Sequence, residues 1–260
     1  MTTHASIVLG TTLVALAISH DTDEARYIEL GAELPAVVQV GGMGSGTIIA
    51  PEWVLTAAHV PEMLERMRPG AALFVTVGET TIEVSEVHAP PQRAAEPQLH
   101  DIALLRLKSP VAAEVEPLAL WQDTPRSGQD VVIAGWGVLA VADKGIEMSP
   151  AAMAAPTRAR RAGRNVIDRY EPDTGLLYGD LDMPGEGVDL EAGPSIGDSG
   201  GPALVWVAGQ DGSPATWRIA GVLALIDDTD QDRILGEYGE EFGMTSVVGH
   251  LDWIESLVAR

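Results

Sequence analysis

The stretch GPSIGDSGGPALV, residues 193–205, sets a serine between an aspartate and two glycines just before an apolar run. The glycines and prolines predict a turn, and the apolar run predicts a strand. Because it has no side chain, Gly197 lets the backbone turn sharply. A surface turn alone would explain this composition, so the role of Ser199 has to be judged from the rest of the chain.

Composition indicates a folded protein. The chain has 260 residues, of which 46% are apolar, so it can bury a large core as one large domain or two small ones. It carries 38 acidic and 16 basic residues, for a net charge of −22. This acidity argues against a nucleic-acid partner and favours solubility. The chain contains no cysteine, which excludes disulfides and thiolate metal sites.

The hydrophobic pattern predicts a mostly β protein. Residues 73–77 and 81–87 alternate in polarity, and Gly78-Glu79-Thr80 between them predicts a hairpin. Short strands separated by turn signals favour a barrel or a sandwich. Further strands are expected at residues 101–107, 130–138, 202–208 and 216–226, with a turn at 208–213.

Helical spacing is confined to short segments. Apolar residues recur every three or four positions near the C-terminus, which predicts an amphipathic helix over about 247–259. Residues 61–67 predict one short helical turn. Residues 139–194 contain several prolines and show the least pattern.

Two further stretches supply the residues that Ser199 would need. GSGTIIAPEWVLTAAHV, residues 44–60, contains His59, and HDIALLRL, residues 100–107, contains Asp101 at the head of an apolar strand. Taken alone, each residue has an ordinary structural explanation. His59 could be a structural histidine, and Asp101 and Ser199 could be turn residues. Together they follow one of the chain orders of Ser-His-Asp hydrolases. A histidine can take the proton from a serine hydroxyl, and a buried aspartate can orient the imidazole.

TAAHV, HDIALLRL, AGWG and GDSGGP together resemble the trypsin-like serine peptidases of the chymotrypsin fold, over nearly the whole chain from Ile18 onward. The resemblance implies an all-β protein with two six-stranded antiparallel Greek-key barrels packed face to face and a C-terminal α-helix. The first barrel is expected at about 30–120 and the second at about 121–246. The peptidase domain would then span residues 18–260.

For the site, the resemblance implies that His59 is the base, Asp101 its support and Ser199 the nucleophile. The backbone N–H groups of Gly197 and Ser199 would form the oxyanion hole. The expected function is a serine endopeptidase that acts on proteins or peptides through an acyl-enzyme, as a monomer and without metal or organic cofactor. Two alternatives stay open: a catalytically silent binding protein on the same fold, and an esterase-like hydrolase.

The first residues resemble an export signal. Residues 5–17 are uncharged and mostly apolar, too short to cross a bilayer comfortably, and Ala15-Leu16-Ala17 is a small-x-small triplet. We therefore expect a signal peptide over residues 1–17, cleaved before Ile18, as the chain's only membrane contact. The protein would be secreted or periplasmic. A buried N-terminal strand is the alternative.

Asp198 requires a partner, because a buried carboxylate without one is costly. In the family that the chain resembles, this partner is the α-ammonium of the mature N-terminus, which here would be that of Ile18. Export itself would then activate the enzyme. The alternative is a cut after Arg26 that releases Tyr27, a bulky residue for such a pocket.

The chain departs from the family at its disulfides and at its specificity pocket. Gly44 and Val60 stand where the family has a disulfide beside the catalytic histidine, and a second bridge is missing near Ser195. Ala224 replaces a serine whose hydroxyl commonly supports the catalytic aspartate. The pocket residues predict a shallow apolar site for small or medium side chains rather than Arg or Lys: Gly193 at its base, with Ala224, Ile226 and Phe242 as walls.

Two charged clusters have no role in this scheme. The basic cluster, in the unpatterned middle, favours a solvated loop that neutralises carboxylates, with a binding patch or a self-cleavage site as alternatives. The acidic cluster also favours a solvated loop, although Ca²⁺ binding or recognition of a basic substrate group is conceivable. Their members are Arg158, Arg160, Arg161 and Arg164, and Asp227, Asp228, Asp230 and Asp232.

Overall fold

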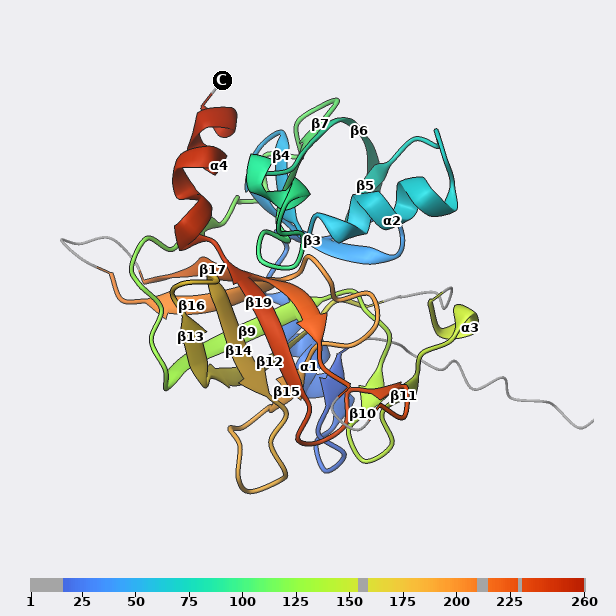
Figure 1. Cartoon of the computed structure of the whole chain (residues 1–260), viewed down its shortest axis with the longest axis vertical. Helices are drawn as coiled ribbons and strands as arrows, with labels where there is room; N and C mark the ends of the chain where they lie inside the picture. Colours follow the sequence, from blue (N-terminus) through green and yellow to red (C-terminus); the bar gives the residue numbers. More distant parts are fainter. Residues whose placement is uncertain (1–15, 154–158, 210–214, 229–230, 260) are drawn as a thin grey trace, which may run out of the picture.

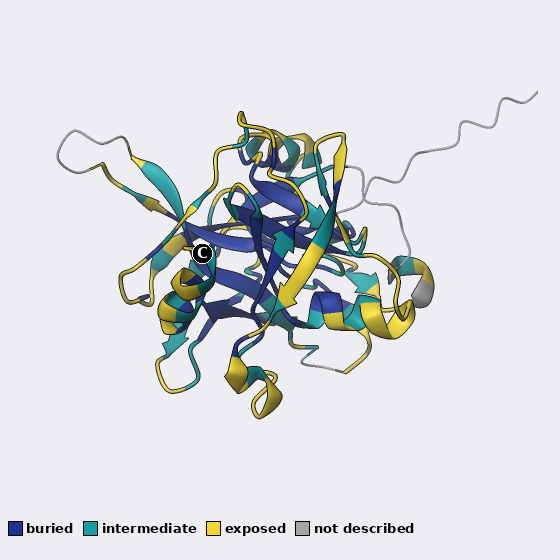
Figure 2. Cartoon of the chain, turned by 90° about the horizontal axis from the view of Figure 1, so that it is seen from above, coloured by how far each residue is buried: buried dark blue, intermediate teal, exposed yellow. Residues whose placement is uncertain are grey.

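The structure is a computed structural model that describes residues 16–153, 159–209, 215–228 and 231–259. The described chain is mostly β. Strands of its first half form one layer and strands of its second half another, and the helices lie at the periphery (Figure 1). The strands of both layers are buried at their centres, whereas helices and loop tips are exposed (Figure 2).

The first layer is a closed barrel of six antiparallel strands. Its apolar side chains form one core, because alternate residues of each strand point inward. The predicted hairpin is confirmed: Val77 pairs with Thr80, and Gly78 has a φ of 58°. In barrel order, the strands are β2 (Val37–Val40), β3 (Gly44–Ala50), β4 (Trp53–Thr56), β7 (Ala103–Leu107), β6 (Thr80–His88) and β5 (Phe74–Val77).

The second layer is an eight-stranded sheet. Seven strands follow one another by pairing, and the eighth, β8 (Ala119–Leu120), pairs in parallel with β17. The seven in order are β12 (Arg161–Ile167), β9 (Gln129–Gly135), β16 (Pro202–Val207), β17 (Thr216–Ile226), β19 (Glu241–Ser246), β14 (Leu176–Asp180) and β13 (Arg169–Glu171).

This second sheet differs from the expected six-stranded closed barrel, because no ladder joins β12 to β14. The two strands nevertheless lie close together. Asn165 Nδ2 donates to the Asp180 carbonyl at 2.7 Å, and Asp168 N donates to the Tyr178 carbonyl at 2.9 Å. Single hydrogen bonds, one from a side chain, therefore take the place of regular pairing at this seam.

A small three-stranded sheet ties the first described residues to the serine loop. β1 (Ala17–Ile18) runs parallel to β10 (Ala140–Val141) and antiparallel to β15 (Ala192–Gly193). Ala17 pairs with Gly193, six residues before Ser199. A second small sheet pairs β11 (Ile146–Glu147) with β18 (Ile234–Leu235).

Helix α1 (Glu24–Ala32) was not predicted from the sequence. Asp23 caps it by accepting a hydrogen bond from Ala25 N at 2.9 Å, which satisfies one free donor of the first turn. Tyr27 within it is fully buried, and its hydroxyl donates to the Glu191 carbonyl at 2.9 Å. Tyr27 is therefore a core residue of a helix.

The remaining helices are short. The predicted turn at 61–67 is the later part of α2 (His59–Met67), which begins two residues earlier. The C-terminal helix is confirmed as η2 (Val248–His250) followed by α4 (Leu251–Val258). The others are η1 (Pro91–Ala94) and α3 (Pro150–Met153). Among the described helices, none is long and apolar enough to cross a bilayer.

Two arginines of the basic cluster contact other elements within the fold and do not form a surface patch. Arg161 is fully buried and forms an ion pair with Glu24 of α1. Arg160 donates to the Gly31 and Val37 carbonyls, at 2.6 and 3.0 Å, and lies over the ring of Trp136. Of the other two members, Arg164 is exposed and Arg158 lies outside the described residues.

Carboxylates of the acidic cluster cap local turns. Asp228 accepts from Arg233 N at 3.0 Å, and Asp232 accepts from Ile234 N at 2.7 Å. Asp230 lies outside the described residues. Within the described part of the chain, no group of three or more His, Cys, Asp or Glu is arranged to hold a metal ion.

Packing occupies the place of the absent disulfide beside His59. A Cβ added to Gly44 would lie 2.6 Å from Val60 Cγ1, so the valine methyl fills the space that a second sulfur would need. The buried Val60 thus joins β3 to the start of α2 by contact alone.

We predict that the paired variant Gly44→Cys/Val60→Cys forms a disulfide in oxidising buffer. A bridge closing a loop of this length should raise the free energy of unfolding by about 3 kcal/mol. Denaturant unfolding with and without a reductant measures the difference, and Val60→Cys alone is the control. If the oxidised double variant kept two free thiols, that result would contradict the close approach of residues 44 and 60.

Candidate active site

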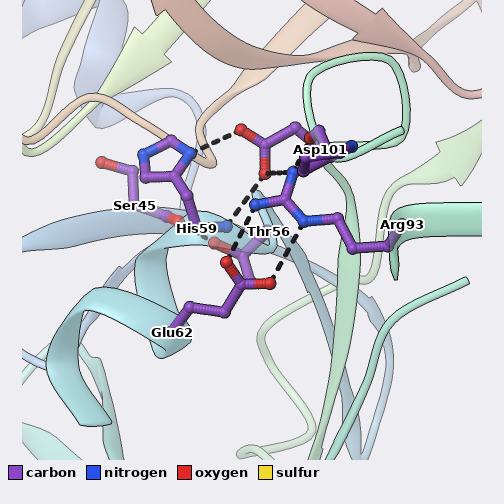
Figure 3. Close-up of polar contacts among 7 residues, drawn as sticks. Ser45, Thr56, His59, Glu62, Arg93 and Asp101 are labelled. Carbon is purple, nitrogen blue, oxygen red and sulfur yellow. Dashed lines mark hydrogen bonds and ion pairs between the residues drawn. The ribbon is translucent and has the colours of Figure 1, made fainter. Parts of the chain in front are cut away.

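His59 and Asp101 lie in direct contact although 42 residues separate them. His59 opens α2, and Asp101 lies two residues before the buried start of β7. His59 Nδ1 lies 2.5 Å from Asp101 Oδ2, and His59 N donates to Asp101 Oδ1 at 2.9 Å (Figure 3). The carboxylate therefore fixes both the ring and the backbone of the histidine. Its side chain is only 9% exposed, against 27% for His59.

The loop that carries Ser199 is bound to both layers. Ser45 of β3 donates from its N to the Ser199 carbonyl at 2.9 Å and from its Oγ to the Gly197 carbonyl at 3.0 Å. On the other side, Gly200 N donates to the Leu223 carbonyl of β17 at 2.8 Å. The serine is thus held at the junction of barrel and sheet.

Two glycines make this loop possible. Gly197 has a φ of 94°, and a Cβ there would lie 3.1 Å from Gly137 Cα. Gly200 has a φ of 87°, and a Cβ there would overlap Thr56 Oγ1. Both positions require left-handed backbone in a crowded place, which only glycine adopts readily. The sequence-based reason given for Gly197 agrees with this geometry.

His59, Gly197 and Ser199 line one cavity of about 220 Å³. No hydrogen bond joins His59 to Ser199 in the described structure, and free enzymes often close this contact only with substrate bound. Nor do the N–H groups of Gly197 and Ser199 have hydrogen-bond partners among the described residues. A base, a hydroxyl and two free donors around one cavity can perform acyl transfer.

Asp198 is fully buried and accepts three backbone hydrogen bonds. Gly137 N donates to Oδ1 at 2.8 Å, and Ser195 N donates to Oδ2 at 2.9 Å. The third donor is Leu16 N, 3.3 Å from Oδ2. Burial raises the pKa of the Asp198 carboxyl to about 7, although these backbone hydrogen bonds oppose the shift.

The residue beside Asp198 is therefore Leu16, whereas the sequence led us to expect Ile18. Ile18 lies two residues further along, in β1, where its carbonyl accepts from Ala142 N at 3.0 Å. The alternative partner, Tyr27, is inside α1. Leu16 and Ala17 are fully buried in the described chain, and this packing brings Leu16 N, two residues before Ile18, to Asp198. Residues 1–15 of the expected signal lie outside the described residues.

The expected pocket residues divide between two cavities. Ala224 and Ile226 line the larger cavity with Ser199. Gly193 and Phe242 line a separate cavity of only about 10 Å³ behind it. Ile226 borders both, so its side chain stands between the larger cavity and the expected base of the pocket.

The inner cavity also contains a carboxyl group that the sequence did not reveal. Glu240 is buried, and its Oε2 accepts from Gly236 N at 2.5 Å and from Glu237 N at 3.1 Å. Burial raises the pKa of the Glu240 carboxyl to about 7. Sequence spacing could not place it, because the segment between β17 and β19 has no motif to fix its register.

The chain is similar to known proteins in both sequence and structure. A model of the family described as Trypsin matches residues 28–234. The chain belongs to the trypsin family. Relatives of this family are serine proteases, so the chain is a member of a peptidase family and the resemblance noted in the sequence is confirmed.

Individual relatives agree. Snake venom serine protease KN6 from Trimeresurus stejnegeri is 30% identical over 227 residues, which cover 83% of this chain and 77% of that protein. Vitamin K-dependent protein C from Rattus norvegicus is 26% identical over 83% of this chain and 46% of its own length. The structure of mouse neuropsin superposes with a TM-score of 0.61 at 21% identity, covering 87% and 95% of the two chains, which supports the fold.

Other residues around the site also escaped the sequence analysis. Ser45 lies in a Gly-Ser-Gly run that precedes His59, and only its contacts to Gly197 and Ser199 reveal its importance. Arg93 lies 3.1 Å from Asp101 Oδ1 through its Nη1. It lies in η1, a short helix that begins with a proline and follows no recognisable sequence pattern.

The pKa of Asp198 predicts how stability depends on pH in the chain that retains residues 1–15. The folded carboxyl keeps its proton up to about pH 7, whereas the unfolded one loses it near pH 4. Stability should therefore fall as pH rises between these values, by at most about 4 kcal/mol. Urea unfolding at pH 4.5 and 7.5 of the inactive Ser199→Ala chain measures this slope.

The variant Asp198→Asn, in the same inactive chain, removes the titrating group. Its stability should fall less over the same pH range, even if it is lower throughout. An unchanged slope would mean that Asp198 is ionised before the chain is cut.

Proposed function

We propose that the protein is an exported serine endopeptidase whose catalytic residues are His59, Asp101 and Ser199. The observation that carries this proposal is the single cavity lined by His59 and Ser199, with Asp101 bonded to the far side of the imidazole. Membership of a serine protease family supports the same reaction. Protein or peptide chains would be the substrates.

In the proposed reaction, His59 Nε2 takes the proton of Ser199 Oγ as the oxygen attacks a peptide carbonyl. The carboxylate of Asp101 holds Nδ1–H and stabilises the imidazolium that forms. The N–H groups of Gly197 and Ser199 receive the negative charge on the carbonyl oxygen. His59 then gives the proton to the leaving amine, and water releases the acyl group by the same steps. No cofactor is required.

We further propose that cleavage of the Ala15–Leu16 bond completes the site. The new α-ammonium of Leu16 would lie where Leu16 N now contacts Asp198. A cation there offsets the cost of burying the carboxylate. In the uncut chain Leu16 has a φ of 53°, a conformation that costs about 1–2 kcal/mol for residues other than glycine. A cut before Leu16 removes that constraint.

The intact mass of the exported protein, measured with and without a fluorophosphonate that labels reactive serines, tests both the catalytic role of Ser199 and the cut before Leu16. We expect a chain that begins at Leu16 and takes one label. The label should be absent from Ser199→Ala, which is the matched control.

The outcomes separate the alternatives. A chain that begins at Ile18 and takes the label would refute the Leu16 terminus but keep the catalytic proposal. A correctly cut chain that takes no label would instead support a silent binding protein, which no feature of the described residues favours. Labelling with turnover of simple esters but not of peptides would indicate an esterase-like hydrolase.

We also propose that the enzyme prefers small or medium apolar side chains on the acyl side of the cleaved bond. The larger cavity is mainly apolar, and Ile226 separates it from Gly193. A long basic side chain would have to pass Ile226 to reach the inner cavity and Glu240 there.

Ile226→Gly should join the two cavities and let larger side chains enter. We expect the ratio of kcat/KM for Phe over Ala substrates to rise at least about tenfold, since each added buried methylene is worth about 1 kcal/mol or more. Peptide substrates that differ only at this residue measure the ratio. Ile226→Val keeps a branched side chain across the passage and should leave the ratio near that of the parent. An unchanged ratio in Ile226→Gly would place the substrate side chain elsewhere.

A further inference from the structure

The carboxylate of Asp101 has a guanidinium as its third partner. Besides the two bonds from His59, Oδ1 lies 3.1 Å from Arg93 Nη1. Among the described residues, no hydroxyl group donates to this carboxylate. Ala224, at the position where the family resemblance implies a serine, has no side-chain donor. Thr56 Oγ1 donates to the backbone carbonyl of Ser45 in β3 instead, at 2.7 Å.

Arg93 is held rigidly on its other side. Its Nε and Nη2 donate to the two carboxylate oxygens of Glu62, at 3.1 and 2.9 Å, in a bidentate pair (Figure 3). Its Nη1 also donates to the carbonyl of Pro97. The Arg93 side chain is only 11% exposed. A planar guanidinium with this many partners has little freedom to move.

Glu62 belongs to α2, three residues after His59, so it faces the same side of the helix. Arg93 therefore connects the first turn of that helix with Asp101. Burial disfavours the charge on Arg93, but the hydrogen bond to Glu62 and the charges of Asp101 and Glu62 outweigh it, and its pKa lies above the ordinary value. The guanidinium remains a cation at any working pH.

We propose that Arg93 is a positioning residue that takes the place of the absent serine hydroxyl: it holds the Asp101 carboxylate against His59, while Glu62 balances its charge. This inference rests on the proposed function of His59, Asp101 and Ser199. Because a cation replaces a neutral donor, removing Arg93 or Glu62 changes the net charge beside His59.

Other titratable groups surround the same carboxylate and must be kept constant. His100 adjoins Asp101, and its Nδ1 lies 3.0 Å from His250 Nε2, on η2. Glu96 lies 3.5 Å from His100 Nε2. Any pH effect assigned to Arg93 must therefore come from variants that leave these three residues intact.

Two variants should shift the pH dependence in opposite directions. In Arg93→Met the two carboxylates lose their cation and favour the imidazolium, so the acid limb of kcat/KM should move up by about half to one pH unit. In Glu62→Gln the cation loses its balancing charge, and the limb should move down. A merely structural role would lower kcat in both variants without opposite shifts. Loss of positioning should also lower kcat in Arg93→Met by roughly 10- to 100-fold.

Rescue and control variants complete the test. Arg93→Met/Ala224→Ser returns a hydroxyl donor and should recover part of the lost kcat. Arg106→Met removes an arginine that pairs with Glu86 on the same barrel, away from His59, and should leave the limb unchanged. The proposal would be overturned if Arg93→Met kept kcat within twofold of the parent value and the midpoint of the acid limb within 0.2 pH unit of the parent midpoint.

A second readout does not need turnover. In ¹⁵N-histidine protein carrying Ser199→Ala, the His59 signals, identified with His59→Gln, should titrate at higher pH in Arg93→Met and at lower pH in Glu62→Gln. If the parent protein neither takes the label nor cleaves peptides, the proposed function fails while this titration still decides the role of Arg93. Equal midpoints in all three proteins would refute that role.

Discussion

The buried carboxylate of Asp198 is the constraint on which the serine loop depends. Water cannot reach it, so its oxygens must be satisfied by the protein, and three backbone N–H groups from separate segments meet there. Those segments are the loop after β9, the loop after β15 and the first described residues. One side chain thus ties the backbone before Ser199 to two other segments of the chain. The proposed ion pair with Leu16 would add the charge that this site still lacks.

The side chains that we propose to be catalytic depend on a second, partly buried set of charges. Glu62, Arg93 and Asp101 alternate in sign and end at His59 (Figure 3). The set comes almost entirely from the first barrel, whereas Ser199 comes from the second sheet. Ser45 connects the two through its bonds to the Ser199 and Gly197 carbonyls. Barrel and sheet must therefore pack correctly before base and nucleophile can face one cavity.

Sequence motifs predicted the family and the contact between His59 and Asp101, because each of these two residues lies in a short motif whose local structure depends mainly on neighbouring residues. They could not predict the role of Arg93, which reaches Asp101 from η1, a short helix with no recognisable sequence pattern. The residue that contacts Asp198 lies two positions before the one that the sequence indicated, because apolar residues continue through 15–18 and only the pairing of β1 with β15 fixes the register. Helix α1 was missed because its cap, Asp23, and its first residue, Glu24, lie in a polar run.

Acylation of amines tests the proposed Leu16–Asp198 ion pair most directly. The chain has only two lysines, Lys108 and Lys144, and both side chains are exposed, so they serve as internal controls. In folded, active protein treated with acetic anhydride at mild pH, we expect both lysines to react while the Leu16 α-amine stays protected until the protein is unfolded. Rapid acylation of that amine in folded protein that keeps its reactivity toward fluorophosphonate would contradict the account.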